Sequence, residues 1–361
     1  MSCRRIRDYG ISIGSFPTGE RNSIGDIPGV SVGHCTIDTE RHKTGVTVIL
    51  PCEDNIFAKK LAAASYVLNG FGKTAGTIQI NELGTLESPI ALTNTLNVGL
   101  VHDALVSYIV NRCQKEGIPL FSFNSVTGEC NDCHLNDIKD RAVNASHVFS
   151  AISSASADFE QGDVGAGKGT ICFGLKGGIG SSSRRIEIGG KNYHIGVLVQ
   201  SNFGKMEDLT IQGMEIGKAI KEWQDKEKKK CLKTDDEGSI MSIIATDIPL
   251  SSRQLHRILR RAAMGLGRTG SHVGHGSGDV MIGFSTANII SDTSDDGEAF
   301  SHIQILNESL MDLPFRAVIE AEEEAILNSL AASDSVTGYT GETCHALDPY
   351  LRRYLELQKL Q

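Results

Sequence analysis

Apolar residues along this chain gather in short runs, several of them with a two-residue period, which is typical of buried β-strands. These runs predict strands at residues 45–50, 89–95, 119–123, 193–200, 239–247 and 279–287. Glycine, with 39 residues, recurs at the ends of such runs, as expected where strands end in turns. The pattern therefore favours a fold rich in short strands.

A helical period follows Pro249 and predicts an amphipathic helix. Its apolar positions are Leu255, Ile258, Leu259, Ala262, Ala263 and Leu266, with Ser251 or Ser252 as the N-cap and Gly267 past the end. Two more helices are expected at residues 316–331 and at roughly 98–113. Strands that alternate with such helices indicate a layered α/β fold, although strand order does not follow from the pattern.

Residues 222–238 interrupt the pattern. They begin as the tail of a helix and continue through KEKKK and DDE with almost no apolar content. Such a run predicts a solvated, mobile linker. The part that follows, 239–361, holds few strands, so we expect it to complete a shared core within a single domain spanning 1–361.

Composition and charge narrow the class of protein. The chain has 361 residues, 40% of them hydrophobic, which is enough for a substantial core. The net charge of −9, without a basic stripe, argues against nucleic acid or an anionic membrane as a partner. The first residues lack the apolar region of a signal peptide, and no run reaches the ~18 apolar residues of a membrane helix. We therefore expect a soluble, cytoplasmic protein.

Cysteine usage agrees with a reducing compartment. Nine cysteines are scattered along the chain, and Cys130 and Cys133 form a C-x-x-C pair. Zinc sites usually need a second pair at matching spacing, and none occurs here. We favour structural or incidental thiols over a metal or redox site.

The glycine-rich stretch GDVGAGKG, residues 162–169, resembles a phosphate-binding loop only in part. Gly169 stands where that loop needs Ser or Thr, and the following TICFGLKGGIG predicts a strand and a turn rather than a helix. We expect instead a glycine-rich turn that borders a cleft.

The stretch HVGHGSGD, residues 272–279, holds two histidines and an aspartate. His272 and His275 lack the helical spacing of a metal motif, so incidental loop histidines are favoured over a metal site. Ser277 and Asp279 differ, because two residues apart at the start of a strand they point to the same side. A hydroxyl hydrogen-bonded to a carboxylate can act as a proton relay.

The dipeptide Gly238-Ser239 lies where the charged linker meets a predicted strand. Attack of the Ser239 hydroxyl on the Gly238 carbonyl, followed by hydrolysis, would cut the chain there, and glycine tolerates the strained geometry. Ser239 would then carry a nucleophile and an α-amine whose ordinary pKa, ~7.7 to 8.0, suits a general base. A plain linker beside a core strand remains the alternative.

The segment GSIMSIIATDIPLSSRQLHRILRRAAMGLGRTGS, residues 238–271, resembles the P1 family of self-processing aminopeptidases. That family includes the L-aminopeptidase/D-Ala-esterase/amidase (DmpA) type and the β-peptidyl aminopeptidases. Further matches follow in order along nearly the whole chain, among them NSIGDIPGVSVGHCTID, GECNDCHLNDI, GLKGGIGSSSR, VLVQSNFG, SGD and AEEEAILNSL.

The resemblance implies a four-layer αββα sandwich, similar to that of N-terminal nucleophile (Ntn) hydrolases but distinct in strand direction and connectivity. It also implies a self-cut into 1–238 and 239–361, a homo-oligomer, and no need for a metal or organic cofactor. The implied activity is removal of N-terminal residues from small peptides, amides or esters that carry a free amino terminus, through an acyl-enzyme on Ser239.

Five residues acquire roles by this resemblance. Ser239 is the nucleophile, Ser277 and Asp279 form a polar relay beside it, and Asn202 supplies an amide to the oxyanion hole. Glu129 binds the free amine of the substrate through a charge-assisted hydrogen bond, which would explain an exopeptidase. Taken singly, Asn202 fits a turn, Glu129 a solvated carboxylate and Asp279 a strand cap.

Three positions depart from the family's pattern and predict an altered lining of the substrate pocket. Asn131 replaces an aromatic residue, Cys133 a glycine, and Lys168 a small polar residue. Two alternatives stay open. One is an acyltransferase of the ornithine acetyltransferase type, which shares the fold plan but uses threonine at the new terminus. The other is an unprocessed, non-enzymatic homologue.

Overall fold

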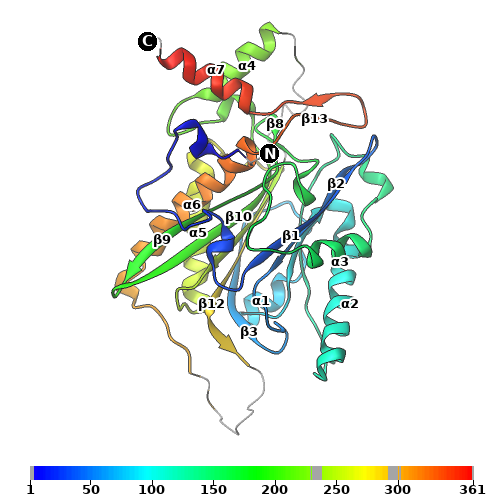
Figure 1. The fold of residues 1–361 in the computed structure, drawn as a ribbon, viewed down its shortest axis with the longest axis vertical. Coiled ribbons are helices and arrows are strands. Elements are labelled where there is room, and N and C mark those ends of the chain that lie inside the picture. Colours follow the sequence, from blue (N-terminus) through cyan, green and yellow to red (C-terminus); the bar gives the residue numbers. More distant parts are fainter. Residues whose placement is uncertain (1–3, 228, 230–237, 292–299, 301, 360–361) are drawn as a thin grey trace.

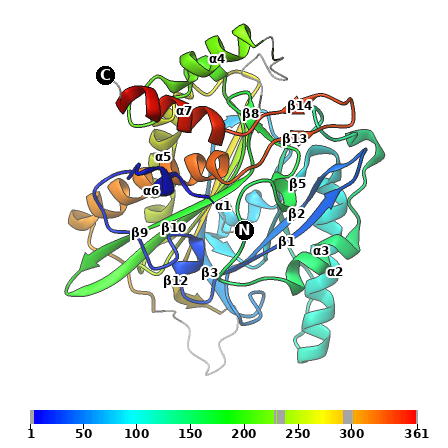
Figure 2. The same cartoon turned by 45° about the horizontal axis from the view of Figure 1, so that its top comes forward.

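Two β-sheets lie face to face in the computed structural model of the chain, with helices on their outer sides (Figures 1 and 2). All residues are described except 1–3, 228, 230–237, 292–299, 301 and 360–361. The α-helices are α1 Thr77–Leu83, α2 Val98–Glu116, α3 Ala145–Ser153, α4 Ile216–Lys226, α5 Ser252–Arg268, α6 Asp312–Ala331 and α7 Asp348–Lys359.

The larger sheet has six strands in the order β4-β3-β12-β11-β10-β9, and the smaller has four, β1-β2-β5-β6. The remaining strands form the short hairpins β7–β8 and β13–β14. The bounds are β1 Ser31–Asp38, β2 Lys43–Leu50, β3 Lys60–Gly70, β4 Thr85–Leu86, β5 Ile90–Asn94, β6 Val126–Cys130, β7 Ile171–Cys172, β8 Leu175–Lys176, β9 Ile179–Ile188, β10 Lys191–Asn202, β11 Ser239–Thr246, β12 Gly278–Ile290, β13 Val336–Thr337 and β14 Thr343–Cys344.

Two neighbouring pairs of strands are parallel, β5–β6 and β11–β12. Parallel neighbours need a long connection, and a helix supplies it in each case, α2 for the first pair and α5 for the second. The order also shows that β11 and β12, from the last third of the chain, lie between β10 and β3 from the earlier part.

Alternating side chains of the strands build the layers. On β11, Met241 and Ile243 pack in the core between the two sheets, whereas Ile240 and Ile244 pack in the core beneath α5 and α6. A third apolar cluster joins the outer face of the smaller sheet to α2 and α3. Because both faces of β11 are covered, its sequence is continuously apolar. These layers confirm the predicted αββα sandwich.

The two sheets approach closely beside Glu129, where Gly128 of β6 faces Met241 of β11. A Cβ on Gly128 would lie 2.5 Å from Cε of Met241, so the Met241 side chain would have to move to make room for it. The close approach brings the ends of β6 and β11 together. The thiol of Cys130 bridges the same gap, 3.5 Å from the carbonyl oxygen of Ser239.

The predicted strands are confirmed except the one at residues 119–123. That stretch is an extended connection between α2 and β6, and the strand begins only at Val126. Its side chain Phe121 is 97% exposed, although Leu120 and Phe123 pack partly on the core. An apolar run that touches the core without pairing to a neighbouring strand gives the same sequence signal as a strand.

The three predicted helices are confirmed, with one boundary corrected. Ser251 is the N-cap of α5, as expected, but the helix continues through Gly267 to Arg268. A Cβ on Gly267 would meet no atom, so this glycine sits on an open face, where glycine inside a helix costs only about 1 kcal/mol. The helix tail expected from residue 222 is the end of α4, and residues 228 and 230–237 of the linker lie outside the described residues.

The C-terminal helix packs against a helix from the middle of the chain. Helix α7 packs beside α4 at one end of the molecule, where Gln224 donates a hydrogen bond to the hydroxyl of Tyr350 (Figure 2).

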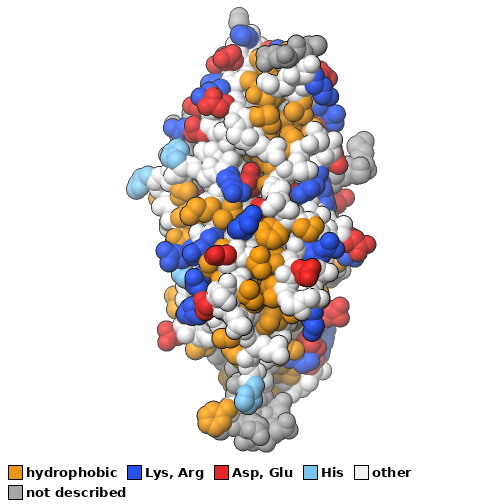
Figure 3. All heavy atoms as spheres, turned by 90° about the vertical axis from the view of Figure 1, so that its left-hand side faces the viewer, with side chains coloured by type: hydrophobic (Ala, Val, Ile, Leu, Met, Phe, Trp, Pro, Cys, Tyr) orange, Lys and Arg blue, Asp and Glu red, His pale blue; other side chains and the backbone are white. Residues whose placement is uncertain are grey.

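Charged side chains of both signs mix with hydrophobic ones on the side at the left of Figure 1 (Figure 3). Within the described residues, every helix is too short or too polar to cross a membrane.

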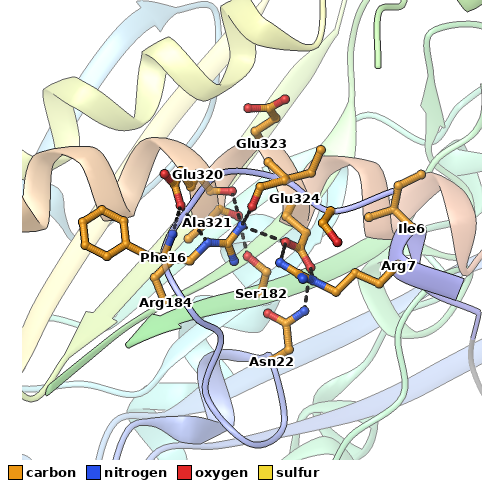
Figure 4. A network of polar contacts seen from close by, with 12 residues as sticks. Ile6, Arg7, Phe16, Asn22, Ser182, Arg184, Glu320, Ala321, Glu323 and Glu324 are labelled. Carbon is orange, nitrogen blue, oxygen red and sulfur yellow. Dashed lines mark hydrogen bonds and ion pairs between the residues drawn. The ribbon is translucent and has the colours of Figure 1, made fainter. Parts of the chain in front are cut away.

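A buried ionic network fastens the N-terminal segment to the larger sheet and α6 (Figure 4). Arg184 of β9 is fully buried and donates to both Glu320 and Glu324. Glu324 also accepts from Arg7 and from the amide of Asn22. Burial alone would raise the pKa of Glu324, but the Arg7 bond and the Arg184 charge hold it below its usual range. Glu324 is therefore ionised in the folded protein at neutral pH.

Replacing Arg184 tests this network. Arg184→Met should lower the free energy of unfolding by about 3–5 kcal/mol, because it leaves buried carboxylates without their shared cation. Urea denaturation measures the change. Arg185→Met is the matched control, since its side chain lies exposed on the same strand and should change stability by about 0.5 kcal/mol or less. Equal losses in the two variants would contradict the assignment.

Candidate active site

A cavity of about 390 Å³ opens where strand ends of the two sheets converge. Glu129 comes from β6, Asn202 from the end of β10, and Ser239 from the start of β11. Its full lining is Phe71, Lys73, Thr95, Glu129, Asn131, Cys133, His134, Asn202, Gly238, Ser239, His275 and Gly276. Several of the residues predicted from sequence therefore share one cavity, although they are far apart along the chain.

Strand register places Asn202 directly beside Ser239. The two residues are partners in the antiparallel β10–β11 ladder, and both are almost completely buried. Such partners have Cβ atoms about 4.5–5.5 Å apart on the same face of a sheet. The backbone N–H of Ile171 donates to Oδ1 of Asn202 at 2.9 Å. This bond orients the amide so that its Nδ2 group is the donor.

The hydroxyl of Ser239 lies against the peptide bond that precedes it. Its Oγ donates to the carbonyl oxygen of Gly238 at 2.7 Å. The backbone N–H of Gly278 donates to the same carbonyl oxygen at 2.8 Å. The carbonyl carbon that Ser239 would attack therefore belongs to a carbonyl already polarised by two donors.

Glycine at position 278 is required by close packing. Gly278 is the register partner of Ser239 in the parallel β11–β12 ladder. A Cβ there would lie 2.6 Å from the carbonyl oxygen of Phe71. The absence of a side chain lets the chain around Phe71 close over the start of β12, which forms one wall of the cavity.

Ser277 and Asp279 form the predicted pair. The Ser277 hydroxyl donates to Oδ1 of Asp279 at 2.7 Å, and both residues are buried. They flank Gly278, but neither is among the described residues that line the cavity. Strand alternation puts Ser239 on the face toward the other sheet and Asp279 on the face toward α5 and α6. The pair thus lies beside the backbone of Ser239 rather than beside its side chain.

Glu129 is held rigidly in the cavity wall. Its Oε1 accepts from the backbone N–H of Lys73 at 3.0 Å, and its Oε2 accepts from the hydroxyl of Thr95. The residue Glu129 is 3% exposed, which excludes the solvated loop position that its neighbours in sequence would allow. Thr95 directly follows β5, the parallel neighbour of β6, so the two strands present both groups at one edge.

Two of the three departures from the family's pattern lie in the cavity and one does not. Asn131 and Cys133 line it. Lys168 is not among the described lining residues, because its Nζ forms ion pairs with Asp38 and Asp163 at 2.8 Å each. The glycine-rich loop 162–169 likewise contributes no described residue to this lining, which corrects the expectation for Lys168 and for that loop.

Between Asn131 and Cys133 in the cavity wall, the carboxyl group of Asp132 is buried. Asp132 accepts from the amide of Asn136 at 2.9 Å, and burial raises the pKa of Asp132 to about 6. Cys130 lies between the two sheets, whereas Cys133 lines the cavity, and neither cysteine forms a disulfide bond. Across the part of the chain that the structure describes, no three His, Cys, Asp or Glu side chains gather as a metal site would require.

Other contributors to the site were not predicted. His275 lines the cavity, although its loop spacing suggested an incidental histidine, whereas His272 is exposed near Asp208. The N–H groups of Lys73 and Gly278 act through the backbone, which leaves no trace in residue type. Thr95 directly follows β5, and only this position could have marked it as part of the site.

Fold and site together define a class: a layered αββα hydrolase with a serine at the first position of a central strand, facing a strand-end amide. The chain belongs to peptidase family S58, whose sequence model matches residues 22–344. It is a self-processing aminopeptidase of the serine type, and the family match favours this activity over the acyltransferase alternative.

Similar proteins extend along almost the whole chain. The β-peptidyl aminopeptidase BapA of Sphingosinicella xenopeptidilytica is 38% identical over 351 residues, covering 92% of this chain and 86% of that protein. The structure of the PH0078 protein of Pyrococcus horikoshii OT3 has a TM-score of 0.88 and 44% identity, covering 97% and 99% of the two chains.

A third relative carries the same fold. It is the L-aminopeptidase D-Ala-esterase/amidase of Ochrobactrum anthropi, described as a prototype for the serine aminopeptidases and a variant of the Ntn hydrolase fold. Its TM-score is 0.87 at 32% identity, with 97% and 99% of the two chains covered. The predicted relation to Ntn hydrolases is thereby confirmed.

Thiol labelling tests the lining of the cavity. Iodoacetamide should modify Cys133 at least about ten-fold faster than Cys130, because exposure controls access to a thiol. Fragmentation of the labelled peptide by mass spectrometry separates the two positions. Cys133→Ser should lose this label while the half-buried Cys35 and Cys52 react as before. Equal labelling of Cys130 and Cys133 would show that the cavity is formed differently.

Proposed function

We propose that Ser239 is the nucleophile both for cutting its own chain and for hydrolysing substrates. The observation that supports this most directly is the strand register: Ser239 pairs with Asn202 on β10 and with Gly278 on β12. A hydroxyl between a side-chain amide and a backbone N–H has the donors that a tetrahedral oxyanion requires.

The self-cut begins with attack of Ser239 Oγ on the carbonyl carbon of Gly238. A C–O bond forms, the C–N bond between the two residues breaks, and the hydroxyl proton moves to the released nitrogen. Water then hydrolyses the ester, giving a carboxylate at Gly238 and restoring the hydroxyl. The N–H of Gly278 stabilises the oxyanion, since it already binds this carbonyl oxygen.

The peptidase reaction repeats the chemistry on a substrate. Glu129 holds the free ammonium of the substrate, while Ser239 attacks its first carbonyl carbon and Asn202 Nδ2 binds the oxyanion. The α-amine of Ser239 takes the hydroxyl proton and passes it to the leaving nitrogen. Water then releases the acyl group. The pair Ser277–Asp279 lies beside the backbone of Ser239, which suits a relay acting on that amine rather than on the hydroxyl.

Substrates of this enzyme are small peptides, amides or esters with a free amino terminus. Glu129 and its two donors sit in the same cavity as the nucleophile, which supports binding of the substrate's free amine close to the bond that is cut. Asn131 and Cys133 surround this space and make its specificity differ from that of relatives with other residues there.

The wider organisation belongs to the same proposal. The pieces 1–238 and 239–361 form a single domain that survives the cut, because β11 and β12 stay paired to β10 and β3. We place the enzyme in the cytoplasm as a homo-oligomer. Large exposed apolar side chains such as Ile78, 87% exposed, and Phe121 support contacts between copies.

A denaturing gel tests the self-cut. The wild-type chain should give two bands, corresponding to 1–238 and 239–361, and Ser239→Ala should give one band, because it has no nucleophile. Ser239→Cys is the matched control, since it keeps a nucleophile and should still release the smaller piece. N-terminal sequencing of that piece should begin at Ser239. Two bands from Ser239→Ala would refute autocatalysis at this bond.

Glu129→Gln tests the amine subsite. The change keeps the shape but removes the charge, so kcat/KM for substrates with a free amine should fall about 10- to 100-fold, the usual worth of a charge-assisted hydrogen bond. Activity on the N-acetylated form of the same substrate serves as the internal control and should change little. If both substrates lost activity equally, Glu129 would have some other role.

A further inference from the structure

A fully buried lysine lies behind the site, on the short hairpin β7–β8. The Nζ of Lys176 donates to the carbonyl oxygens of Gly167, Thr170 and Gly177 at 2.8, 2.9 and 2.7 Å. An ammonium group has three N–H donors, so these bonds use all of them. Lys176 has no exposed surface and does not line the cavity. The peptidase mechanism described above leaves this buried cation unused.

One of the three carbonyls leads directly to the site. The peptide unit between Thr170 and Ile171 accepts from Lys176 at its oxygen and donates from its N–H to Oδ1 of Asn202 at 2.9 Å. A peptide polarised at its oxygen by a cation becomes a stronger donor at its nitrogen, and an amide polarised at Oδ1 becomes a stronger donor at Nδ2. The chain of bonds therefore runs from the charge to the atom proposed to bind the oxyanion.

We propose that Lys176 is a positioning residue for the aminopeptidase reaction, one that orients and polarises the Asn202 amide through the Thr170–Ile171 peptide. The inference rests on the proposed role of Asn202 in the oxyanion hole. The proposal also gives the glycine-rich segment around Lys176 a function. Backbone carbonyls of this segment bind the Lys176 ammonium group, and this group in turn binds the Thr170–Ile171 peptide, which holds the Asn202 amide.

The geometry of the hairpin supports a rigid link. Lys176 and Ile171 are register partners in β7–β8, and the carbonyl of Thr170 also accepts from the N–H of Gly177 at 3.1 Å. The hairpin is joined to the end of β10 a second time, since the N–H of Phe173 donates to the carbonyl of Phe203. Turning the Asn202 amide would break its bond to the N–H of Ile171, and the other bonds of the hairpin keep that N–H from following.

The charge of Lys176 is sensitive to pH in the working range. Burial lowers its pKa to about 8, against an opposing effect of Asp163, with Lys168 lowering it further and the thiols of Cys344 and Cys172 nearby. Its own backbone N–H is bound to the carbonyl of His345. Between about pH 8 and the ordinary lysine pKa of 10.5, Lys176 is deprotonated in more of the folded molecules than of the unfolded ones. The contribution of Lys176 to the free energy of unfolding therefore increases as the pH rises through that window.

The first test is a double-mutant cycle measured as kcat on one amide substrate. An oxyanion donor is worth ~10²- to 10³-fold in kcat, and a polarising bond strengthens it by ~10–30%, so Lys176→Met should lower kcat roughly two- to ten-fold with little change in KM. In the Asn202→Ala background the same substitution should have no further effect. Equal losses in both backgrounds would overturn the proposal for Lys176.

This cycle separates failure of the inference from failure of the proposed function. If Asn202→Ala leaves kcat unchanged, the oxyanion role of Asn202 is wrong and the inference falls with it. If Asn202→Ala lowers kcat but Lys176→Met does not, the function stands and the inference alone is wrong.

The second test uses the pH profile, because a purely structural role would not follow the charge. The ratio of wild-type to Lys176→Met kcat cancels the titrating groups that do not interact with Lys176, and it should decline as pH rises through about 8. A ratio that stays constant from pH 6.5 to pH 9.5 would overturn the proposal.

Neighbouring variants keep the test decisive if Lys176→Met does not fold. Asp163→Asn removes the carboxylate that raises the pKa of Lys176, so the alkaline decline of kcat should move to lower pH. Lys168→Met removes a repelling charge and should move it to higher pH, while kcat at pH 6.5 stays within about two-fold. Shifts in the opposite directions, or none, would refute a role for the Lys176 charge.

Discussion

The register of three adjacent strands is the constraint on which the site depends. Pairing of β10, β11 and β12 sets Asn202, Ser239 and Gly278 in one row across the sheet, and a slip of one residue would turn every side chain of the shifted strand to the other face. Both faces of β11 are buried, so such a slip would also exchange the side chains that pack in the two cores and disrupt the packing of both. The hydrophobic cores on the two sides of the larger sheet thus hold the nucleophile in place.

Three buried ionisable groups in this frame avoid an uncompensated charge, each in a different way. Arg184 is paired with carboxylates of α6, and Lys176 is bound by backbone carbonyls. Glu322 of α6 accepts from Ser242 of β11, and burial raises the pKa of Glu322 to about 8, so it stays largely protonated at neutral pH. A neutral acid, a paired cation and a carbonyl-bound cation all avoid an uncompensated buried charge.

Much of the fold and part of the site followed from the sequence because they depend on residue type. Apolar periodicity marked β11, β12 and α5, and the junction at Ser239 was found because a polar linker met a core strand there. The segment 119–123 misled for the same reason, since apolar side chains report burial and not strand pairing. Lys176 and Thr95 escaped notice because their importance lies in distant partners. The N–H of Gly278 escaped because every residue but proline has one.

The uncut chain also explains how one serine can serve two reactions. Gly238 lines the cavity, and its carbonyl oxygen accepts a hydrogen bond from the Ser239 hydroxyl. In the proposed mechanism, the acyl group of Gly238 therefore occupies the position that the acyl group of a substrate takes later. Gly278 contacts that carbonyl from β12, whereas Asn202 stands on the β10 side. In the proposed mechanism, the new carboxylate has to leave after the cut before a substrate enters, and the amine left on Ser239 supplies the base. Under this proposal, the same row of residues across β10, β11 and β12 first carries out the self-cut and then serves as the active site.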